Sequence, residues 1–588
     1  MANLTKTQKI RLQKINEDPV LWAQTFLRTY DSKLGRETRW TARWYQVEML
    51  RDKSTKRVYR CGRRTGKCLP GDSTILDYRT GERITVKELF ERQQAYLITM
   101  DEKYKLQKHF TNQIFENGIK EVFEVETSSG RTIRATGNHP LFTATGWAEI
   151  DDLKVGDKVA IASKMPYFGN QDVEDEKIKM VAYMIGDGNC TTSTIRFSTA
   201  SNKIKEDVEE SLEFFNCSLI KYNSSKKYDY NIVKKENRNN RFFKNNFLEY
   251  LKEIDLLGKD SFNKRIPDFV FKMSKEKIAL FLSRLYSTDG WATTYKNRLQ
   301  IGYSSVSINL IKDVQHLLLR FGINSYITSK KINGMGDKKY YSLYITNSLE
   351  AIKFIEEINI YSKEDATKKV YELAKKNKKS DRLIPKEILT FVEEERVRQG
   401  LTKRALCEDK DERFRLCYDI KREKLKHYGE VLGNEDIINF SDGDFLFEKI
   451  VSIKSVGMMQ TYDFTVPITS NFVVDDFITH NTETMVVDSL YHALTKPNFR
   501  VLIVTPYENQ VRLAFTRLNE LINASPLVKA RVISSTKNPY KIDIDNNSGI
   551  WGFTTGASTG SGAASIRGQR ADMIVMDEVD CAYTCSSL

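Results

Sequence analysis

The chain has 588 residues, which is too long for one hydrophobic core and predicts several domains. Its 40% hydrophobic and 29% charged residues are typical of globular proteins. With neither a transmembrane run nor a signal peptide in the sequence, membrane-spanning and secreted classes are excluded and a cytoplasmic protein is expected. The eight cysteines lie far apart, which favours free thiols over disulfides or a zinc site.

The formal net charge of +14 is concentrated in residues 1–67, which hold 17 Lys and Arg against 6 Asp and Glu. Residues 482–588 hold ten of each. The basic excess of the N-terminal arm has two interpretations, solubility or contact with nucleic-acid phosphates.

The N-terminal arm is predicted to lead into a phosphate-binding loop. A helix is expected after Asn16, a suitable N-cap, with Pro19 in its first turn. A strand over 56–60 then enters the sequence Cys61-Gly62-Arg63-Arg64-Thr65-Gly66-Lys67. In such loops backbone N–H groups and a lysine bind phosphate, and a Ser or Thr after the lysine binds Mg²⁺. Here Cys68 follows instead, and Cys61 replaces the usual first glycine.

The missing hydroxyl residue stands at Thr482, directly after His480-Asn481. Joining Lys67 to Thr482 restores the loop and continues it into a helix over 482–490. The residues that would then bind ATP and Mg²⁺ are Gly62, Gly66, Lys67 and Thr482. We therefore interpret residues 68–481 as an insert that masks a nucleotide site.

Four stretches of the insert resemble the splicing blocks of inteins, in the same order. The first begins Cys68-Leu69-Pro70-Gly71-Asp72, and the second is Thr136-Gly137-Asn138-His139. The third is 461–466, which contains Asp463, and the fourth is 471–481, which ends in His480-Asn481. Short strand-like runs over 84–162 and 446–478 predict an all-β splicing domain (Hint fold) in two halves, 68–165 and 446–481.

The residue types at these positions suit protein splicing. The Cys68 thiol can attack the carbonyl of Lys67 and convert the amide to a thioester. His139 can deliver a proton to the leaving nitrogen while Thr136 helps to hold the peptide. The Thr482 hydroxyl then takes over the acyl group, and Asn481 cyclises with help from His480 and releases the insert. The resemblance implies that Asp463 activates either Cys68 or the branch step.

Residues 166–363 contain an internal repeat. The segments 178–188 and 278–290 are both apolar helices that end in an acid before glycine, at Asp187 and Asp289. They resemble the signature helices of LAGLIDADG homing endonucleases, an α+β fold. The resemblance implies Mg²⁺-dependent cleavage of double-stranded DNA, with Asp187 and Asp289 as metal ligands and Lys264 near the scissile phosphate. An inactive nuclease is the alternative. Residues 364–445 are charged and helical, either a DNA-binding subdomain or a linker.

The C-terminal arm alternates strands and helices, which predicts an α/β P-loop NTPase divided between the two arms. A strand is expected at 500–506, a helix at 510–521 and paired strands at 540–544 and 549–553. The last apolar strand ends in Asp577-Glu578, where Asp577 would bind Mg²⁺ and Glu578 would orient the attacking water.

Both arms together resemble the ATPase domain of phage terminase large subunits, the motors that package DNA. The resemblance implies that Gln46 lies near adenine, that Arg63 or Arg64 lies near the γ-phosphate, and that a terminase small subunit and a portal are partners. A helicase-like or recombinase-like host is the alternative. Because the sequence stops ten residues after Glu578, we expect a truncated or split gene, or a second insert that begins at Cys581.

Overall fold

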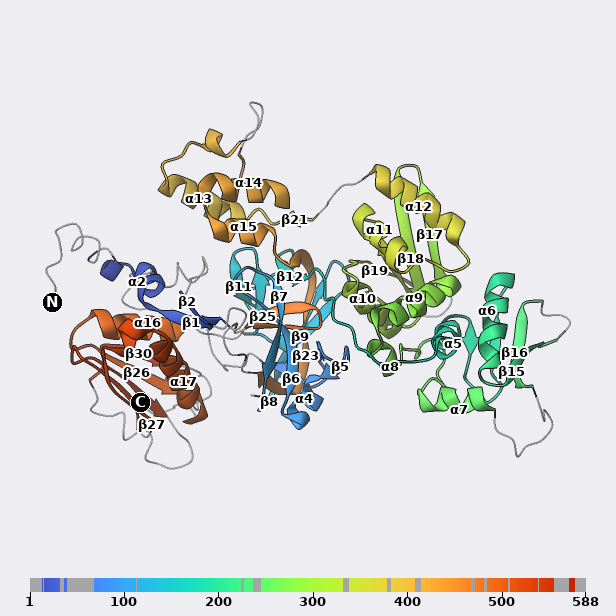
Figure 1. The fold of residues 1–588 in the computed structure, drawn as a ribbon, viewed down its shortest axis with the longest axis horizontal. Coiled ribbons are helices and arrows are strands. Elements are labelled where there is room, and N and C mark those ends of the chain that lie inside the picture. The colour runs from blue at the N-terminus through green and yellow to red at the C-terminus, as the bar shows by residue number, and fades with distance from the viewer. Residues whose placement is uncertain are drawn as a thin grey trace.

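The structure is a computed structural model, and it describes residues 13, 15–31, 36–39, 68–112, 114–223, 227–235, 245–331, 338–377, 382–407, 414–464, 466, 469, 471–480, 484–505, 508–537, 539–554 and 570–576. A β-rich domain lies in the middle, with the two terminal arms on one side and a larger α+β domain on the other (Figure 1). A small helical subdomain lies above the β-rich domain. None of the helices in the described ranges is long and apolar enough to cross a membrane.

The central β-rich domain is built from both ends of the insert. Its main sheet runs β11-β10-β25-β12-β23-β8-β9, with β24 paired to β25 and β3 paired to β23. Strands from the C-terminal half therefore lie between strands from the N-terminal half. The N-terminal elements are β3 (Leu69–Pro70), β4 (Thr74–Leu76), β5 (Arg83–Thr85), α4 (Val86–Arg92), β6 (Ala95–Met100), β7 (Leu106–Thr111), β8 (Ile114–Thr127), β9 (Thr132–Thr136), β10 (Pro140–Thr143), β11 (Gly146–Glu149) and β12 (Lys158–Ala162). The C-terminal ones are β23 (Phe445–Phe464), β24 (Asn471–Val474) and β25 (Phe477–His480).

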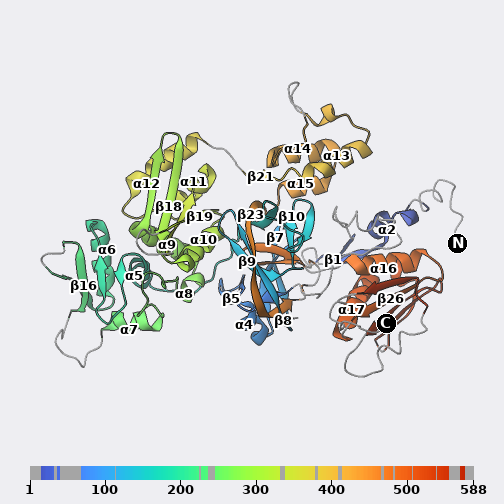
Figure 2. The ribbon, with the colours of Figure 1, turned by 180° about the vertical axis from the view of Figure 1, so that it is seen from behind.

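The α+β domain repeats one pattern twice. Its two four-stranded sheets have the equivalent orders β13-β14-β16-β15 and β17-β18-β20-β19. The first copy comprises α5 (Asp175–Gly186), β13 (Gly188–Asn189), β14 (Arg196–Ser198), α6 (Asn202–Glu213), β15 (Cys217–Lys221), β16 (Asp229–Lys234) and α7 (Asn246–Glu253). The second comprises α8 (Asp268–Phe271), α9 (Lys275–Asp289), β17 (Gly290–Tyr295), β18 (Arg298–Ser305), α10 (Ile308–Arg320), β19 (Tyr326–Lys331), β20 (Lys339–Ile345), α11 (Ser348–Glu357) and α12 (Glu364–Lys376). Seen from behind, the two sheets flank the α5 and α9 helices (Figure 2).

The segment 364–445 does not form one unit. Helix α12 packs into the core of the α+β domain, where Val370 and Ala374 are fully buried. The rest forms a helical subdomain, whose Phe440 packs against Tyr104 and Phe445 of the β-rich domain in a shared core. The domain boundary that the sequence predicts before residue 364 would separate α12 from the core into which it packs. We therefore place this boundary after α12. The subdomain holds β21 (Leu383–Ile384), α13 (Ile388–Arg398), the 3₁₀ helix η1 (Lys403–Leu406), β22 (Ile420–Lys421), α14 (Arg422–Leu432) and α15 (Glu435–Ser441).

The two terminal arms share one hydrophobic core although 414 residues separate them in the sequence. Trp22 of α2 packs edge-on against Tyr491 of α16, at 5.6 Å between ring centroids. The Tyr491 hydroxyl also donates to the carbonyl of Asn16 at 2.9 Å. The described parts of the two arms therefore form one domain while the insert still separates them in the sequence.

The C-terminal arm forms a sheet of order β27-β28-β29-β26-β30, in which β26 is parallel to both β29 and β30. The expected strand, helix and paired strands are all present. The arms comprise α2 (Pro19–Phe26), β1 (Arg28–Asp31), β2 (Arg36–Arg39), α16 (Thr484–Thr495), β26 (Arg500–Thr505), α17 (Glu508–Ala524), α18 (Pro526–Lys529), β27 (Val532–Lys537), β28 (Tyr540–Ile544), β29 (Gly549–Thr554) and β30 (Met573–Met576).

Candidate splicing and nuclease sites

Cys68 lies fully buried at the start of the β-rich domain, held by the second predicted block. The backbone N–H of Cys68 donates to the Thr136 hydroxyl oxygen at 2.9 Å. The backbone N–H of Thr136 donates in turn to the Cys68 carbonyl at 3.0 Å. The side chain of Thr136 thus contacts the nitrogen that must leave when the preceding peptide bond is broken.

The same segment also reaches the C-terminal end of the insert. His139, only 1% exposed, immediately precedes β10, whose Leu141 pairs with Thr479 of β25. Strand β25 ends at His480, whose backbone pairs with Asn471 of β24. Residues 136–141 therefore connect the first residue of the insert to its last described strand.

Asp463 lies close to Cys68 on the neighbouring strand. Leu69 pairs with Tyr462 of β23, so the next step of this antiparallel register brings Cys68 opposite Asp463. Asp463 is 4% exposed, and its carboxylate accepts from the backbone N–H of Phe464 at 2.8 Å. Burial and then the Asp463 charge raise the pKa of the Cys68 thiol from 9.0 to about 12. The thiol is therefore protonated at neutral pH in the folded precursor.

Two donors that the sequence did not reveal contact the Cys68 sulfur. The Asn117 side-chain amide donates to Sγ at 2.9 Å, and the Lys120 ammonium lies 3.7 Å from Sγ. Both come from β8, outside the four predicted blocks. Asn and Lys side chains are mostly solvent-exposed in proteins, so nothing in the local pattern separates these two from surface residues.

Several predicted site residues lie outside the described part of the chain. The structure describes the backbone of His480 but not its side chain. Nothing is described for the two residues Asn481 and Thr482 that flank the C-terminal junction. The same holds for the predicted nucleotide-site residues Gln46, Gly62, Arg63, Arg64, Gly66, Lys67, Asp577 and Glu578. Strand β30 nevertheless ends at Met576, directly before Asp577.

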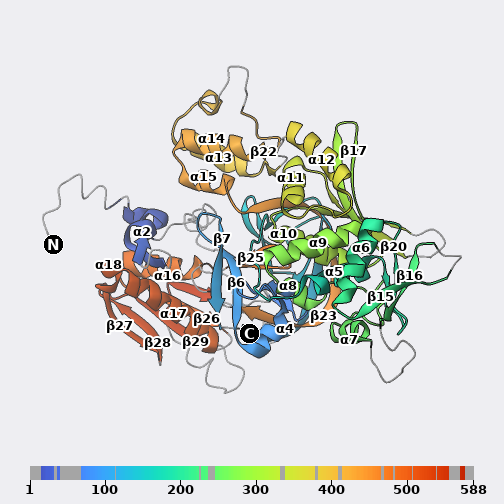
Figure 3. The same cartoon turned by 45° about the vertical axis from the view of Figure 1, so that its right-hand side comes forward.

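Helices α5 and α9 of the α+β domain lie side by side (Figure 3), and they approach at their C-terminal residues Gly186 and Thr288. A Cβ atom added at Gly186 would lie 2.1 Å from Thr288 Oγ1, so only glycine fits there. Asp187 follows the last residue of α5, and Asp289 is the last residue of α9. The close approach of the helices thus brings the two predicted carboxylates to one place.

Each helix end is bound by one lysine. The Lys264 ammonium donates to the carbonyls of Met184, Ile185 and Gly188 at 2.7–3.0 Å. Lys363 does the same at the end of α9, with the carbonyls of Tyr286, Thr288 and Gly290 at 3.4, 3.1 and 2.6 Å. The sequence prediction found Lys264 but missed Lys363. The repeat itself could have indicated it, because Lys264 follows Asp187 by 77 positions and Lys363 follows Asp289 by 74.

The electrostatics of this junction suit a divalent cation. Burial, and next the charge of Asp289, raise the pKa of Asp187 from 3.8 to about 6, and burial also raises the pKa of Asp289. Within the described residues no group of three or more His, Cys, Asp or Glu side chains gathers as a metal site. Two carboxylates fit Mg²⁺, which keeps several waters and is commonly bound by one or two carboxylates plus substrate phosphates.

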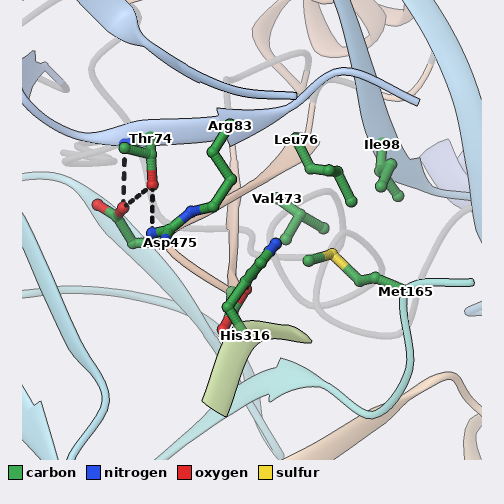
Figure 4. A pocket seen from close by; sticks show the side chains of 9 residues that line it. Thr74, Leu76, Arg83, Ile98, Met165, His316, Val473 and Asp475 are labelled. Carbon is green, nitrogen blue, oxygen red and sulfur yellow. Dashed lines mark hydrogen bonds and ion pairs between the residues drawn. The ribbon is translucent and has the colours of Figure 1, made fainter. Parts of the chain in front are cut away.

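The β-rich and α+β domains meet at helix α10. His316 Nδ1 lies 2.8 Å from the Asp476 carboxylate in the turn between β24 and β25. The neighbouring Asp475 accepts from the backbone N–H and the hydroxyl of Thr74, at 2.9 and 2.8 Å, and Arg83 donates to that hydroxyl (Figure 4). The turn that precedes β25 is therefore held from both domains.

A family model described as the intein splicing domain matches residues 75–481. The chain belongs to this intein family. The match ends at Asn481, the predicted last residue of the insert, and begins seven residues after Cys68. The prediction of an intein with an all-β Hint domain is confirmed.

Three replicative DNA helicases of the DnaB type are similar to this chain. The protein of Synechocystis sp. is 30% identical over 74% of this chain. That of Rhodothermus marinus is 25% identical over 71% of this chain, and that of Nostoc sp. is 27% identical over 73%. The chain matches only 51%, 46% and 51% of their lengths, so it spans about half of each.

Among solved structures, a Ssp DnaB mini-intein variant is 31% identical, with 17% of this chain and 65% of the other covered and a TM-score of 0.16. A homing endonuclease, I-DmoI, is 15% identical, with 31% and 94% covered and a TM-score of 0.22.

These relatives do not support the terminase host that the two arms suggested. They are helicases, so the alternative of a helicase-like P-loop ATPase fits the comparisons better. The terminase small subunit and the portal lose their support as partners. Only 181 residues lie outside 75–481, so more than half of the stretch matched in Synechocystis sp. must lie within the intein itself.

Proposed function

We propose that residues 68–481 excise themselves from the chain and join residues 1–67 to residues 482–588. The observation that carries this proposal is the position of residues 136–141, which contact Cys68 at one end and pair with β25 at the other. Splicing requires both junctions of an insert to react at one place. The shared core of the two arms supports it further, because described residues of both arms already belong to one domain.

The residues have separate roles in this proposal. The Cys68 sulfur attacks the Lys67 carbonyl, and Thr136 holds the Cys68 nitrogen that leaves, with His139 as proton donor. The Thr482 hydroxyl oxygen then bonds to the thioester carbon, the bond from that carbon to the Cys68 sulfur breaks, and the hydroxyl proton ends on the sulfur. Asp463, opposite Cys68, favours the protonated thiol that leaves in this step. Asn481 then cyclises with help from His480. An acyl shift from the oxygen to the nitrogen of Thr482 restores the peptide bond.

The α+β domain is proposed to be a homing endonuclease that cuts double-stranded DNA. The support is the close helix pair that brings Asp187 and Asp289 together, with Lys264 and Lys363 at the helix ends. The carboxylates would hold Mg²⁺, which supplies a Lewis acid for phosphodiester hydrolysis. The two lysines offset negative charge at the junction.

The host is proposed to be a helicase-like P-loop ATPase. The parallel strands β26, β29 and β30 and the DnaB relatives support this class. After ligation Lys67 and Thr482 become neighbours and would bind ATP and Mg²⁺, with Gly62 and Gly66 in the loop, Gln46 at adenine, and Asp577 and Glu578 in hydrolysis. The precursor should not bind ATP, and DNA should stimulate hydrolysis by the ligated host.

Mass spectrometry of the expressed chain tests splicing directly. The 68.1 kDa chain should yield an insert of about 48 kDa and a ligated host of about 20 kDa, in proportion to length. A chain with Cys68→Ala and Asn481→Ala should stay at full mass. If the parent chain also stays at full mass, self-excision is wrong. Strand separation by the ligated host would favour a helicase, whereas ATP hydrolysis without strand separation would contradict that class.

A further inference from the structure

Strand β8 contains an irregularity beside Cys68. Glu116 pairs with Tyr462 and Ile119 pairs with Gln460, so Asn117 and Gly118 together oppose the single residue Thr461. This is a β-bulge, in which one strand has an extra residue. Gly118 has φ = +73°, a conformation that glycine adopts without strain, and its carbonyl accepts from the Thr461 hydroxyl at 2.9 Å.

The bulge changes which side chains share a face. In a regular strand, residues three apart point to opposite sides of the sheet. The extra residue shifts this alternation by one position, so the side chains of Asn117 and Lys120 lie on the same side of the sheet and converge on one atom. That point is the Cys68 sulfur, 2.9 Å from the Asn117 amide nitrogen and 3.7 Å from the Lys120 ammonium. Bulges often re-aim side chains next to active sites, and this one aims two donors at one nucleophile.

We infer that Asn117 and Lys120 are catalytic residues that stabilise the Cys68 thiolate during the first splicing step. This inference rests on the proposed splicing function and assigns two groups to it beyond the four blocks. In the step, the thiol loses its proton, the sulfur forms a bond to the Lys67 carbonyl carbon, and the bond from that carbon to the Cys68 nitrogen breaks. The thiol proton ends on the freed amine, so no other reactant is needed.

The surroundings of the sulfur show why such donors are needed. Cys68 is fully buried, and Asp463 is the acidic neighbour across the ladder; both disfavour a thiolate. Lys120 acts in the opposite direction and lowers the pKa of the thiol, followed by the Thr461 hydroxyl and the Asn117 amide. Hydrogen bonds and a positive charge favour an anion most where water is excluded. The two donors therefore oppose the effects of burial and of Asp463.

The experiment isolates the first step in the full-length chain. In an Asn481→Ala background the C-terminal junction cannot cyclise, so an added thiol such as dithiothreitol should release residues 1–67 by attacking the thioester. The release rate is measured from pH 6 to pH 10. We expect Lys120→Met and Asn117→Ala each to slow release about tenfold or more at pH 7 and to move the pH profile to higher pH. Lys120→Arg should recover most of the rate.

Two controls separate this role from a structural one. Lys454→Met removes an exposed lysine from the adjacent strand β23 and should leave the release rate unchanged. In a Cys68→Ala background, cleavage at Asn481 reports whether the domain is folded, and Lys120→Met and Asn117→Ala should leave it unchanged. If Asn117→Ala fails this test, the nearly isosteric Asn117→Asp replaces it and should slow release further because it adds a negative charge.

The outcomes distinguish the inference from the function on which it rests. A parent chain that releases no fragment with thiol overturns the splicing proposal. A parent that does so, with variants within twofold of its rate at every pH, overturns the role of Asn117 and Lys120. Equal slowing at every pH without recovery in Lys120→Arg also overturns it, because that result indicates lost packing rather than a stabilised thiolate.

Discussion

Lys264 and Lys363 occupy equivalent places in the two halves of the α+β domain. Each ammonium binds backbone carbonyls at the C-terminal end of a helix, and each donates to the glycine that follows the acid, at 2.7 Å to Gly188 and 2.6 Å to Gly290. Helix C-termini carry partial negative charge, and here each also carries a carboxylate. The two lysines therefore offset the negative charge where the two acids meet.

The first prediction concerns Lys363. Lys363→Met should reduce DNA cleavage as strongly as Lys264→Met, about tenfold or more, because each removes one positive charge beside the carboxylates. Cleavage is measured with Mg²⁺ on DNA that carries the uninterrupted host gene. Lys368→Met, on the exposed side of α12, is the matched control and should cut normally. Normal cleavage by Lys363→Met would show that the equivalence of the two lysines is structural only.

The second prediction concerns the pH dependence set by Asp187. Its pKa is about 6 in the folded protein against an ordinary value of 3.8. Between these values the folded chain holds a proton that the unfolded chain has released, so this group lowers the free energy of unfolding as pH rises from about 4 to 6. Asp187→Asn should therefore stabilise the metal-free protein by roughly 1–3 kcal/mol at pH 7.5 and not at pH 4.

The same substitution should abolish cleavage, because the carboxylate is lost. The parent enzyme should also lose activity below about pH 6, where protons compete with the cation for Asp187. Thermal unfolding at pH 4 and pH 7.5, with and without Mg²⁺, checks the predicted stabilisation by Asp187→Asn. A pH series of DNA cleavage checks the loss of activity below about pH 6. Equal stability of parent and Asp187→Asn at pH 7.5 would contradict the electrostatic argument.

The third prediction concerns the helix contact at Gly186. A methyl group there would lie 2.1 Å from Thr288 Oγ1 and 2.5 Å from Thr288 Cβ. Gly186→Ala should therefore separate the helices and lower both stability and cleavage, with a cost of about 1–3 kcal/mol typical of overpacking. Adding Thr288→Gly removes all of the clashing side-chain atoms and should restore part of the lost stability. Unfolding of both variants is compared, and a double variant no better than Gly186→Ala would contradict this explanation.

The sequence predicted those parts of the molecule in which chemistry restricts residue type. The ends of the insert required a thiol, a histidine and an asparagine near two junctions. The intein family match over 75–481 includes the histidine and the asparagine and begins seven residues after the thiol. The duplicated helices likewise required small residues and acids. Those features remain recognisable without any knowledge of the fold.

Other contacts could not be predicted because they depend on tertiary geometry. Asn117 and Lys120 reach Cys68 only through a bulge, and strand alternation alone would separate them. Helix α12 is highly charged, yet its Val370 face is buried in the α+β domain, so composition placed it in the wrong segment. The host class was also misjudged, because the short arms match features that several P-loop ATPases share.

The last prediction concerns Arg320, which connects the β-rich and α+β domains. It is 1% exposed, and its guanidinium donates at 2.6 Å both to Phe271 of the α+β domain and to Gly81 of the β-rich domain. Burial lowers its pKa to about 9, so it stays charged at neutral pH. Arg320→Met should leave two buried carbonyls without their donor and cost about 2–5 kcal/mol. Because α10 also contacts the turn before β25 through His316 and Asp476, splicing should slow as well.

Arg298→Met, on an exposed part of β18, is the matched control for both unfolding and splicing rate. Slower splicing with unchanged stability would place the effect in the β24–β25 turn, whereas unchanged splicing and stability would show that the two domains act independently.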